Sequence, residues 1–194
     1  MFLKRIFDII MAILLLPVVG IFTIIVGLLI YFSDKGPIFY NPKRIGQHGK
    51  PFTMFKFRTM IVNAHDIRLD SGWSTYIAED DPRVTKIGRF LRKTSIDELP
   101  QLFNVLKGEM SIIGPRPDPV DWLGNYTKEE EIFLSVKPGI TGYNQAFFRN
   151  SVDGKRKLIN DIYYAKNISF LLDVKILVKT FKTVVFRENI NRET

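Results

Sequence analysis

The sequence contains no cysteine among its 194 residues. This excludes disulfide bonds, zinc–thiolate sites and cysteine nucleophiles, and it is compatible with a reducing cytosol. Histidine is also rare, since His48 and His65 are the only two. Both are expected at the surface, and we assign neither of them a role.

Charged residues are absent from residues 9–32, although they make up 25% of the whole chain. A straight helix over this run would reach about 36 Å, enough to cross a hydrocarbon core of about 30 Å. The run is too long for the apolar part of a signal peptide, and residues 30–33 (IYFS) are no small-residue cleavage site. We therefore expect a membrane segment here.

Two arrangements of this segment are open: a single span, or a re-entrant hairpin that enters and leaves on the same side. Pro17 lacks a backbone donor and clashes with the preceding turn, so a bend is expected there. Basic residues flank both ends, and the positive-inside rule would retain both flanks in the cytoplasm, which favours the hairpin. These residues are Lys4 and Arg5 before the run, and Lys35, Lys43, Arg44 and Lys50 after it.

Asp8 lies at the edge of the apolar run. A carboxylate in lipid is unfavourable unless it is paired. Arg5 is the natural partner, and water at the interface is the alternative environment.

Basic residues outnumber acidic residues by 28 to 20, which gives a net charge of +8. Such a surplus favours polyanionic partners: nucleic acid, phosphorylated small molecules or an anionic membrane surface. The apolar run favours the last two. Apolar periodicity predicts an amphipathic helix with a cationic face over residues 84–93, and a second basic helix over residues 170–186. The second helix could lie in the headgroup plane or pack on the domain core.

Short extended segments are predicted over residues 38–40 and 52–57, between turn signals. In the second segment, Lys56 and Arg58 alternate with aromatic residues. The alternation could direct two cations toward a phosphate. It could equally form the solvated face of a half-buried strand.

Two adjacent carboxylates, Asp97 and Glu98, occur where a helix is expected to begin, in TSIDELPQL (residues 94–102). One interpretation is structural, because Ser95 and Glu98 have the spacing of a capping box. Pro100 disfavours that cap, whereas a helix start nearer Asp97 places it in the tolerated first turn. The other interpretation is chemical. A carboxylate near a helix N-terminus can form an acyl phosphate, and such a pair can bind magnesium together with substrate phosphates.

Arg116 lies between two prolines in GPRP (residues 114–117). The prolines restrict the backbone, so a stiff loop is expected to present the guanidinium group. A planar fork held in this way suits a bidentate contact with phosphate. A surface turn with a solvated arginine is the alternative.

Several segments, in order along the chain, resemble the bacterial sugar transferase family, the monotopic phosphoglycosyl transferases. They are KRIFD (4–8), GPIF (36–39), KFRTM (56–60), DDPRVT (80–85), RKTSIDELPQLFNV (92–105), MSIIGPRP (110–117) and PGITG (138–142). The resemblance is looser over DIYY (161–164) and Asp173. The chain ends close to where the family's catalytic domain ends, so we expect the minimal form without additional membrane helices.

The resemblance implies an α+β fold that is predominantly helical. Residues 1–34 would form a re-entrant membrane helix-break-helix, and residues 35–194 a cytoplasmic catalytic domain with interfacial amphipathic helices and short β segments. The family often has Ser-Pro at the break, where this chain has Leu16 and Pro17. Pro17 is thus the expected break, without the serine hydroxyl. The protein would lie at the cytoplasmic face of the bacterial inner membrane.

The resemblance also implies a reaction, in which a sugar-1-phosphate passes from a UDP-sugar to undecaprenyl phosphate and UMP is released. Asp97 would be the nucleophile and would carry a covalent phosphosugar, with Mg²⁺ held near it. Glu98 would act as a base or positioning group, and Arg116 would contact phosphate or the nucleotide. Further candidates for phosphate contacts are Arg92, Lys56 and Arg58.

The alternative is a membrane-anchored, non-catalytic module that binds anionic lipid or nucleic acid. It explains the charge and the apolar run but gives no reason for Asp97 and Glu98 beside a Pro-Arg-Pro turn. The resemblance instead implies the lipid bilayer as a partner, no nucleic acid, and downstream glycosyltransferases that would use the product. By analogy, the expected sugar is an N-acetylated hexosamine derivative.

Overall fold

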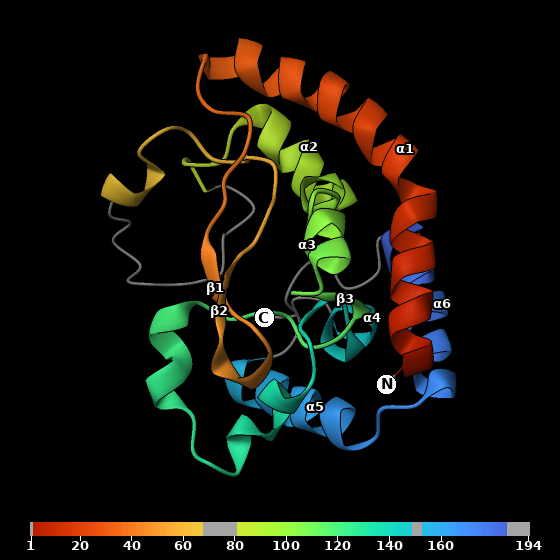
Figure 1. The fold of residues 1–194 in the computed structure, drawn as a ribbon. Coiled ribbons are helices and arrows are strands. Elements are labelled where there is room, and N and C mark those ends of the chain that lie inside the picture. Colours follow the sequence, from red (N-terminus) through yellow and green to blue (C-terminus); the bar gives the residue numbers. More distant parts are fainter. Residues whose placement is uncertain (1, 68–80, 149–152, 186–194) are drawn as a thin grey trace. The chain divides into compact units, whose positions relative to one another are not determined.

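The computed structural model describes residues 2–67, 81–148 and 153–185, which are mostly helical with short strands (Figure 1). The predicted α+β class with predominant helix is therefore confirmed. The chain forms two compact units from separated segments. Unit 1 is built from described residues of Met1–Leu15, Pro42–Met54 and Gln101–Thr194, and unit 2 from those of Leu16–Asn41 and Phe55–Pro100.

Helix α1 (Phe2–Asp34) is the predicted apolar helix, and it continues through Pro17 as one element. Among the described residues it alone is long and apolar enough to cross a membrane, with a mean hydropathy of 3.0 over its most apolar window. Only 17% of that window is buried within the protein. The two units divide the helix between Leu15 and Leu16, next to Pro17. The re-entrant path stays a prediction.

The first turns of α1 are attached to unit 1 by their two basic residues. Lys4 forms a salt bridge with Asp173, with 2.7 Å between Nζ and Oδ2. Arg5 donates from its two terminal nitrogens to the last carbonyl groups of helix α3 (Gln101–Lys107). A cation at a helix C-terminus meets carbonyls that have no partner within the helix, so this contact stabilises both helices.

Asp8 is buried in unit 1, with only 2% of its surface exposed. One oxygen of its carboxylate accepts hydrogen bonds from the Ser111 hydroxyl, at 3.0 Å, and from the Ile112 backbone N–H, at 2.9 Å. Both expected environments, a pair with Arg5 and solvent, are therefore wrong. The two donors compensate for the hydration that the carboxylate has lost.

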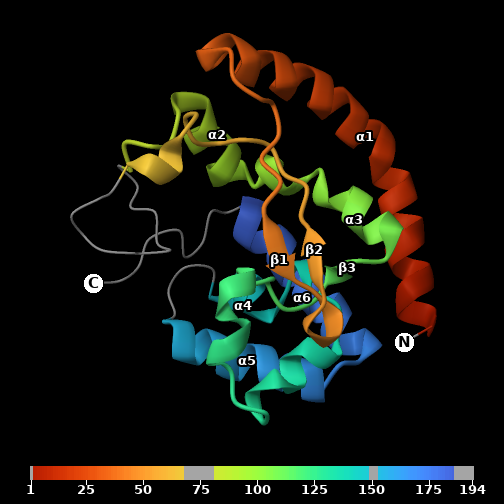
Figure 2. The same cartoon turned by 60° about the vertical axis from the view of Figure 1, so that its left-hand side comes forward.

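Two small sheets belong to unit 1 (Figure 2). Strands β1 (Lys43–Ile45) and β2 (Pro51–Thr53) pair antiparallel, while β3 (Ser111–Ile113) and β4 (Gly139–Thr141) pair parallel. The predicted segment 52–57 is therefore a strand only at its start. Because parallel strands require a long connection, residues 114–138 leave β3 and return to β4, and the Pro-Arg-Pro loop opens this connection.

The connection contains two 3-10 segments, Val120–Asn125 and Glu130–Ser135. Phe133 and Leu134 of the second are buried against Ile45 of β1 and form one core of unit 1. Helices α4 (Tyr143–Phe147), α5 (Gly154–Lys166) and α6 (Phe170–Val185) follow β4. Apolar residues of α5 pack on that core.

Helix α6 confirms the predicted basic helix, and the structure shows which of its residues are buried. Its buried residues are Asp173, Ile176 and Thr183. The apolar stripe of α6, formed by Leu171, Val174, Val178 and Phe181, is exposed, with 79% of Leu171 and 70% of Phe181 accessible. The stripe therefore does not pack on the described core of its own unit.

Unit 2 contains a core of Val26, Ile30, Phe57 and Leu91. Leu91 comes from helix α2 (Lys86–Thr94), which agrees with the predicted helix over residues 84–93. Thr85 caps the helix by accepting a hydrogen bond from the Gly88 N–H at 2.9 Å. Phe90 of this helix is not part of the core, since 60% of it is exposed. Lys86, Arg89 and Lys93 are exposed on the same helix.

The close approach of α2 to Thr59 depends on Gly88, because a β-carbon there would lie 1.9 Å from the Thr59 carbonyl oxygen. We expect Gly88→Ala to lower the free energy of unfolding by about 1–3 kcal/mol, as overpacking does in a close-packed core. Thermal unfolding in detergent would measure the effect. Gly154→Ala is the matched control, since nothing lies within 4 Å of its β-carbon position. Equal melting temperatures for the two variants would contradict the prediction.

Candidate active site

Asp97 lies in a 3-10 turn, Ile96–Glu98, that follows α2 directly. Helix α2 ends at Thr94, and Ser95 follows it in a left-handed conformation with φ of 58°. The side chain of Ser95 makes no capping hydrogen bond, so the capping-box interpretation is wrong. Helix α3 begins only at Gln101, so Pro100 precedes the helix and removes none of its hydrogen bonds. Asp97 therefore lies in a short 3-10 helix and not in the first turn of α3, where its sequence context had suggested it.

The carboxylate of Asp97 is buried beside a cation. Asp97 is 4% exposed, and Lys56 Nζ lies 3.1 Å from its Oδ2. The Asp97 carbonyl accepts a hydrogen bond from the Phe57 N–H at 3.0 Å, which holds the extended segment against the turn. A buried charge requires a partner of opposite sign, and Lys56 supplies it. The solvated-strand interpretation of Lys56 is therefore wrong.

Arg58, the other cation of the segment, is also buried, at 7% exposure. Its two terminal nitrogens donate to the carboxylate of Asp34 at the end of α1, and its Nε donates to the Pro37 carbonyl. Each nitrogen of the guanidinium group thus has a protein acceptor. We assign Arg58 a structural role, which leaves the predicted phosphate contact to other cations.

Arg92 lies near a second buried acid of unit 2. Its Nε donates to the Thr59 hydroxyl at 2.8 Å. Asp81 is 2% exposed and accepts hydrogen bonds from Arg83, the shortest at 2.7 Å. These bonds hold the pKa of Asp81 below its usual value, and the positive charge of Arg92 acts in the same direction. Asp80, the first residue of that motif, lies outside the described residues.

Arg116 belongs to unit 1, where the Pro-Arg-Pro loop follows β3. Pro115 and Pro117 are buried whereas Arg116 is exposed, and the Pro115 carbonyl accepts a hydrogen bond from the Gly139 N–H at 2.8 Å. An exposed arginine between two buried prolines is compatible with the predicted stiff loop and with the alternative of a solvated surface turn. The predicted contact with phosphate stays a prediction.

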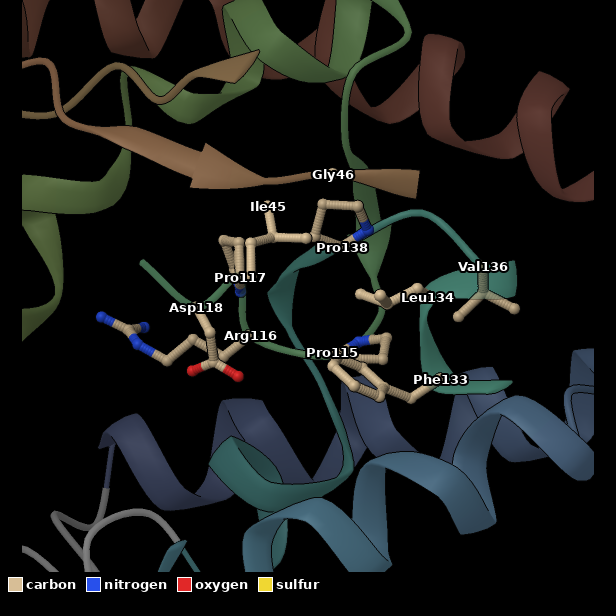
Figure 3. Close-up of a pocket in the computed structure, with 10 residues that line it drawn as sticks. All are labelled: Ile45, Gly46, Pro115, Arg116, Pro117, Asp118, Phe133, Leu134, Val136 and Pro138. Carbon is tan, nitrogen blue, oxygen red and sulfur yellow. The ribbon is translucent and has the colours of Figure 1, made fainter. Parts of the chain in front are cut away.

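A small pocket adjoins this loop (Figure 3). The Arg116 side chain extends away from the apolar end of the pocket, while the carboxylate of Asp118 lies nearer the base of that side chain. The pocket is lined by Ile45, Gly46, Pro115, Arg116, Pro117, Asp118, Phe133, Leu134, Val136 and Pro138. The loop thus has an apolar side that is buried in unit 1, while Arg116 is exposed.

Asp118 connects the loop to α5 through a set of polar contacts. Its carboxylate accepts from Lys157 Nζ, at 2.7 Å, and from the Tyr126 hydroxyl, at 2.9 Å. Lys157 Nζ also lies 3.8 Å from Oδ2 of Asp161, whose Oδ1 accepts from the Asn144 amide at 2.7 Å. The sequence interpretation missed this network. The four-residue spacing of Lys157 and Asp161 on one helix is the signal that could have indicated part of it.

Asp161 is 1% exposed, and burial raises the pKa of its carboxyl group to about 7. The charge of Lys157 and the hydrogen bond from Asn144 act in the opposite direction, while the negative charge of Asp118 adds to the rise. Desolvation dominates because the surrounding unit excludes water from the carboxylate. The network behind the Pro-Arg-Pro loop therefore contains a group that titrates near neutral pH.

Unit 2 brings Asp97 and Lys56 together and also contains Glu98, Arg92 and Arg58, whereas Arg116 comes from unit 1. The described residues include no group of three or more His, Asp or Glu side chains that could hold a metal. Magnesium is commonly bound by one or two carboxylates, while substrate phosphates and water complete its coordination shell. Asp97 and Glu98 could supply these carboxylates. The donor set therefore fits a Mg²⁺ ion that binds together with a phosphorylated substrate.

Comparison with known proteins identifies the family. The profile described as "Bacterial sugar transferase" matches residues 1–187. The chain belongs to the bacterial sugar transferase family. Its ordered sequence motifs therefore indicated the correct family.

Curated sugar transferases of this family match nearly the whole chain. "Uncharacterized sugar transferase EpsL" of Bacillus subtilis is 43% identical over 99% of this chain and 92% of its own length. "Undecaprenyl-phosphate galactose phosphotransferase" of Salmonella typhimurium is 41% identical over 96% of this chain, which spans 41% of that protein. A third relative, from Aeromonas hydrophila, is 35% identical over 95% of this chain and 44% of its own length. Its name is "UDP-N-acetylgalactosamine-undecaprenyl-phosphate N-acetylgalactosaminephosphotransferase".

The titration of Asp161 makes the stability of the fold depend on pH. Its folded-state pKa, about 7, exceeds the unfolded value of 3.8, so the folded protein binds more protons between these values and loses stability as pH rises through this range. We expect the wild type to lose roughly 2–3 kcal/mol more than Asp161→Asn between about pH 5 and pH 8. Thermal unfolding at several pH values measures this difference.

The matched control for this test is Asp121→Asn, because Asp121 is an exposed carboxylate of the same unit. It should follow the wild-type pH dependence. If Asp161→Asn follows it as well, Asp161 does not titrate near neutral pH.

Proposed function

We propose that the protein transfers a sugar-1-phosphate from a UDP-sugar to undecaprenyl phosphate, giving undecaprenyl-diphospho-sugar and UMP. The observation that carries this proposal is a buried carboxylate, Asp97, with Lys56 at 3.1 Å, in a chain of the sugar transferase family. The names of relatives from Salmonella and Aeromonas, which specify undecaprenyl phosphate and a sugar phosphate, support the reaction class. They differ in the sugar, so a screen of UDP-sugars is the experiment that identifies the donor.

In the first step, an oxygen of the Asp97 carboxylate attacks the phosphorus that bears the sugar. The bond from this phosphorus to the oxygen bridging it to UMP breaks, and UMP leaves with the electron pair. The product is an acyl phosphate in which Asp97 carries the sugar-1-phosphate. Lys56 orients the carboxylate and places positive charge beside the incoming diphosphate.

In the second step, an oxygen of undecaprenyl phosphate attacks the same phosphorus and displaces the Asp97 carboxylate. Glu98 assists as a base or positions this acceptor. Arg92 and Arg116 are the proposed contacts for phosphate or nucleotide, because a guanidinium group binds phosphate oxygens in a bidentate manner. A Mg²⁺ ion at Asp97 and the substrate phosphates would supply charge stabilisation for the phosphoryl group.

The non-catalytic alternative is not favoured. It explains the charge of the chain and the apolar helix α1, as the enzyme does. It gives no reason for the buried pair of Asp97 and Lys56, and the named relatives are transferases.

Both ends of α1 are proposed to remain on the cytoplasmic side of the inner membrane. Lys4 and Arg5 at one end bind elements of unit 1, and Asp34 at the other end binds Arg58 of unit 2. The chain also passes between the units at residues 41–42, 54–55 and 100–101, and residues 35–194 contain no second long uncharged run. A helix whose two ends stay on one side must enter and return, and Pro17 is the proposed break.

The exposed stripe of α6 supports an interfacial position of the catalytic part. Leu171, Val174, Val178 and Phe181 form an apolar face, and 70% or more of the first and last is exposed. Lysines at positions 175, 179 and 182 lie on the same helix. A basic helix with an exposed apolar face binds in the headgroup region of an anionic bilayer. The site would then face both a soluble nucleotide sugar and a lipid acceptor.

Purified protein with a UDP-sugar, Mg²⁺ and undecaprenyl phosphate should release UMP, and a panel of UDP-sugars that includes UDP-galactose and UDP-N-acetylgalactosamine would identify the donor. We expect Asp97→Asn to abolish both UMP release and phosphosugar capture on the protein, since an amide oxygen is a poor nucleophile. Mass spectrometry of the intact protein detects the adduct. Asp66→Asn is the matched control, because Asp66 is an exposed carboxylate of the same unit.

An adduct that persists in Asp97→Asn would exclude this residue as the nucleophile. Absence of UMP with every UDP-sugar would count against the reaction itself. The test of the nucleophile and the test of the reaction are separate, because the first uses Asp97→Asn and the second uses UMP release by the wild type.

The membrane path is tested by placing single cysteines in this cysteine-free chain at Phe2 and at Lys50, both exposed and on opposite sides of the apolar run. A membrane-impermeant maleimide should label neither variant in intact cells and both after permeabilisation. Labelling of only one variant in intact cells would restore the single span. Mass shift of the protein provides the readout.

A further inference from the structure

Two cations converge over Gly108 in unit 1. Gly108 follows α3 and has a φ of +84°. The position that its β-carbon would occupy lies 3.5 Å from Arg5 Nη2 and 3.7 Å from Lys137 Nζ. The two side chains therefore border one small space, which glycine leaves open.

Lys137 is the member of this pair that lacks a partner of opposite charge. Arg5 donates to two carbonyl groups at the end of α3. Among the described residues, no carboxylate forms a salt bridge with Lys137, and no acceptor forms a hydrogen bond with its ammonium group. Asp8 attracts it from further away, but one oxygen of Asp8 already accepts two hydrogen bonds.

The electrostatics of this position favour an additional negative charge. Burial lowers the pKa of Lys137, and the positive charge of Arg5 lowers it further, against the opposing effect of Asp8. Two nearby cations repel one another, and partial burial reduces the screening by water. A bound anion would relieve the repulsion and would accept hydrogen bonds from both groups.

The surroundings of this space indicate which anion could reach it. Arg5 lies in the first turns of α1, where 78% of Phe2 and 79% of Leu3 are exposed. The salt bridge between Lys4 and α6 brings the start of that helix to the same end of unit 1 (Figure 1). Phe170 and Leu171 are exposed there, at 73% and 79%. The two cations thus lie at the polar edge of apolar side chains, as headgroup-binding residues do at a bilayer surface.

We propose that Lys137 and Arg5 bind the phosphate group of an anionic membrane lipid over Gly108. The proposal rests on the proposed membrane association, and it goes beyond the transfer reaction because it involves none of the residues assigned to phosphoryl transfer. A soluble phosphate ion presents the same oxygen atoms and is the other source of this ligand. The apolar residues around the site favour the lipid, whose acyl chains would contact them.

The test uses the full chain in detergent micelles and the short-chain lipid dihexanoylphosphatidylglycerol, with inorganic phosphate in a parallel titration, followed by calorimetry. We expect the wild type to bind the lipid at least about tenfold more tightly than inorganic phosphate, a difference of about 1.4 kcal/mol. Lys137→Gln should weaken lipid binding by a similar factor, and Lys137→Arg should retain it. Lys128→Gln is the charge-matched control, because Lys128 is exposed in the same unit.

Equal lipid affinities of the wild type and Lys137→Gln would overturn the proposal. Equal affinities of the wild type for lipid and inorganic phosphate would assign the space to soluble phosphate and overturn the lipid. Loss of binding in Lys137→Gln with retention in Lys137→Arg supports it, since the charge and not the lysine itself would then be required. No nucleotide sugar takes part, so this result is independent of UMP release.

Discussion

The attachment of the charged start of α1 to unit 1 is the interaction on which the rest of the structure depends. Lys4 binds Asp173, Arg5 binds carbonyl groups at the end of α3, and Asp8 accepts hydrogen bonds from β3. The apolar side chains of α1 form no hydrogen bonds or salt bridges with lipid tails. The directional bonds of Lys4, Arg5 and Asp8 fix one end of the helix to a polar framework, and Arg58 fixes the other through Asp34. The proposed return of the helix rests on the basic residues at both ends of the apolar run and on Pro17.

Buried charges recur at each part of the candidate site, and each is compensated locally. Asp97 has Lys56, Asp81 has Arg83, and Asp118 has Lys157. Burial makes such groups unfavourable unless their partners are held in place, so the surrounding backbone must be rigid. The same rigidity positions a nucleophile for an in-line attack on phosphorus. Asp161 and Lys137 of unit 1 are exceptions, since neither charge is fully compensated within the described residues. Burial raises the pKa of Asp161 and lowers that of Lys137.

Several features of the fold were predictable from residues close in sequence. The helix over residues 84–93, the basic helix from Phe170 and the apolar helix at the N-terminus all follow from periodicity, which is a local property. The interpretation of Ser95 as a cap failed because its pattern also fits a left-handed residue that ends the preceding helix. Asp8 was misplaced because its donors come from residues about a hundred positions away, which no local pattern indicates.

The sequence by itself determined the family, the apolar helix and the identity of the carboxylate pair at Asp97, because ordered motifs and composition are properties of the chain alone. Only the tertiary structure decided that Lys56 accompanies Asp97, that Arg58 is committed to Asp34, and that the apolar stripe of α6 is left uncovered. The physical reason is that burial and charge pairing depend on which distant segments meet. The alternation of Lys56 and Arg58 with aromatic residues was compatible with phosphate contacts and with a solvated strand face. The choice required their partners, Asp97 and Asp34, which the local sequence does not indicate.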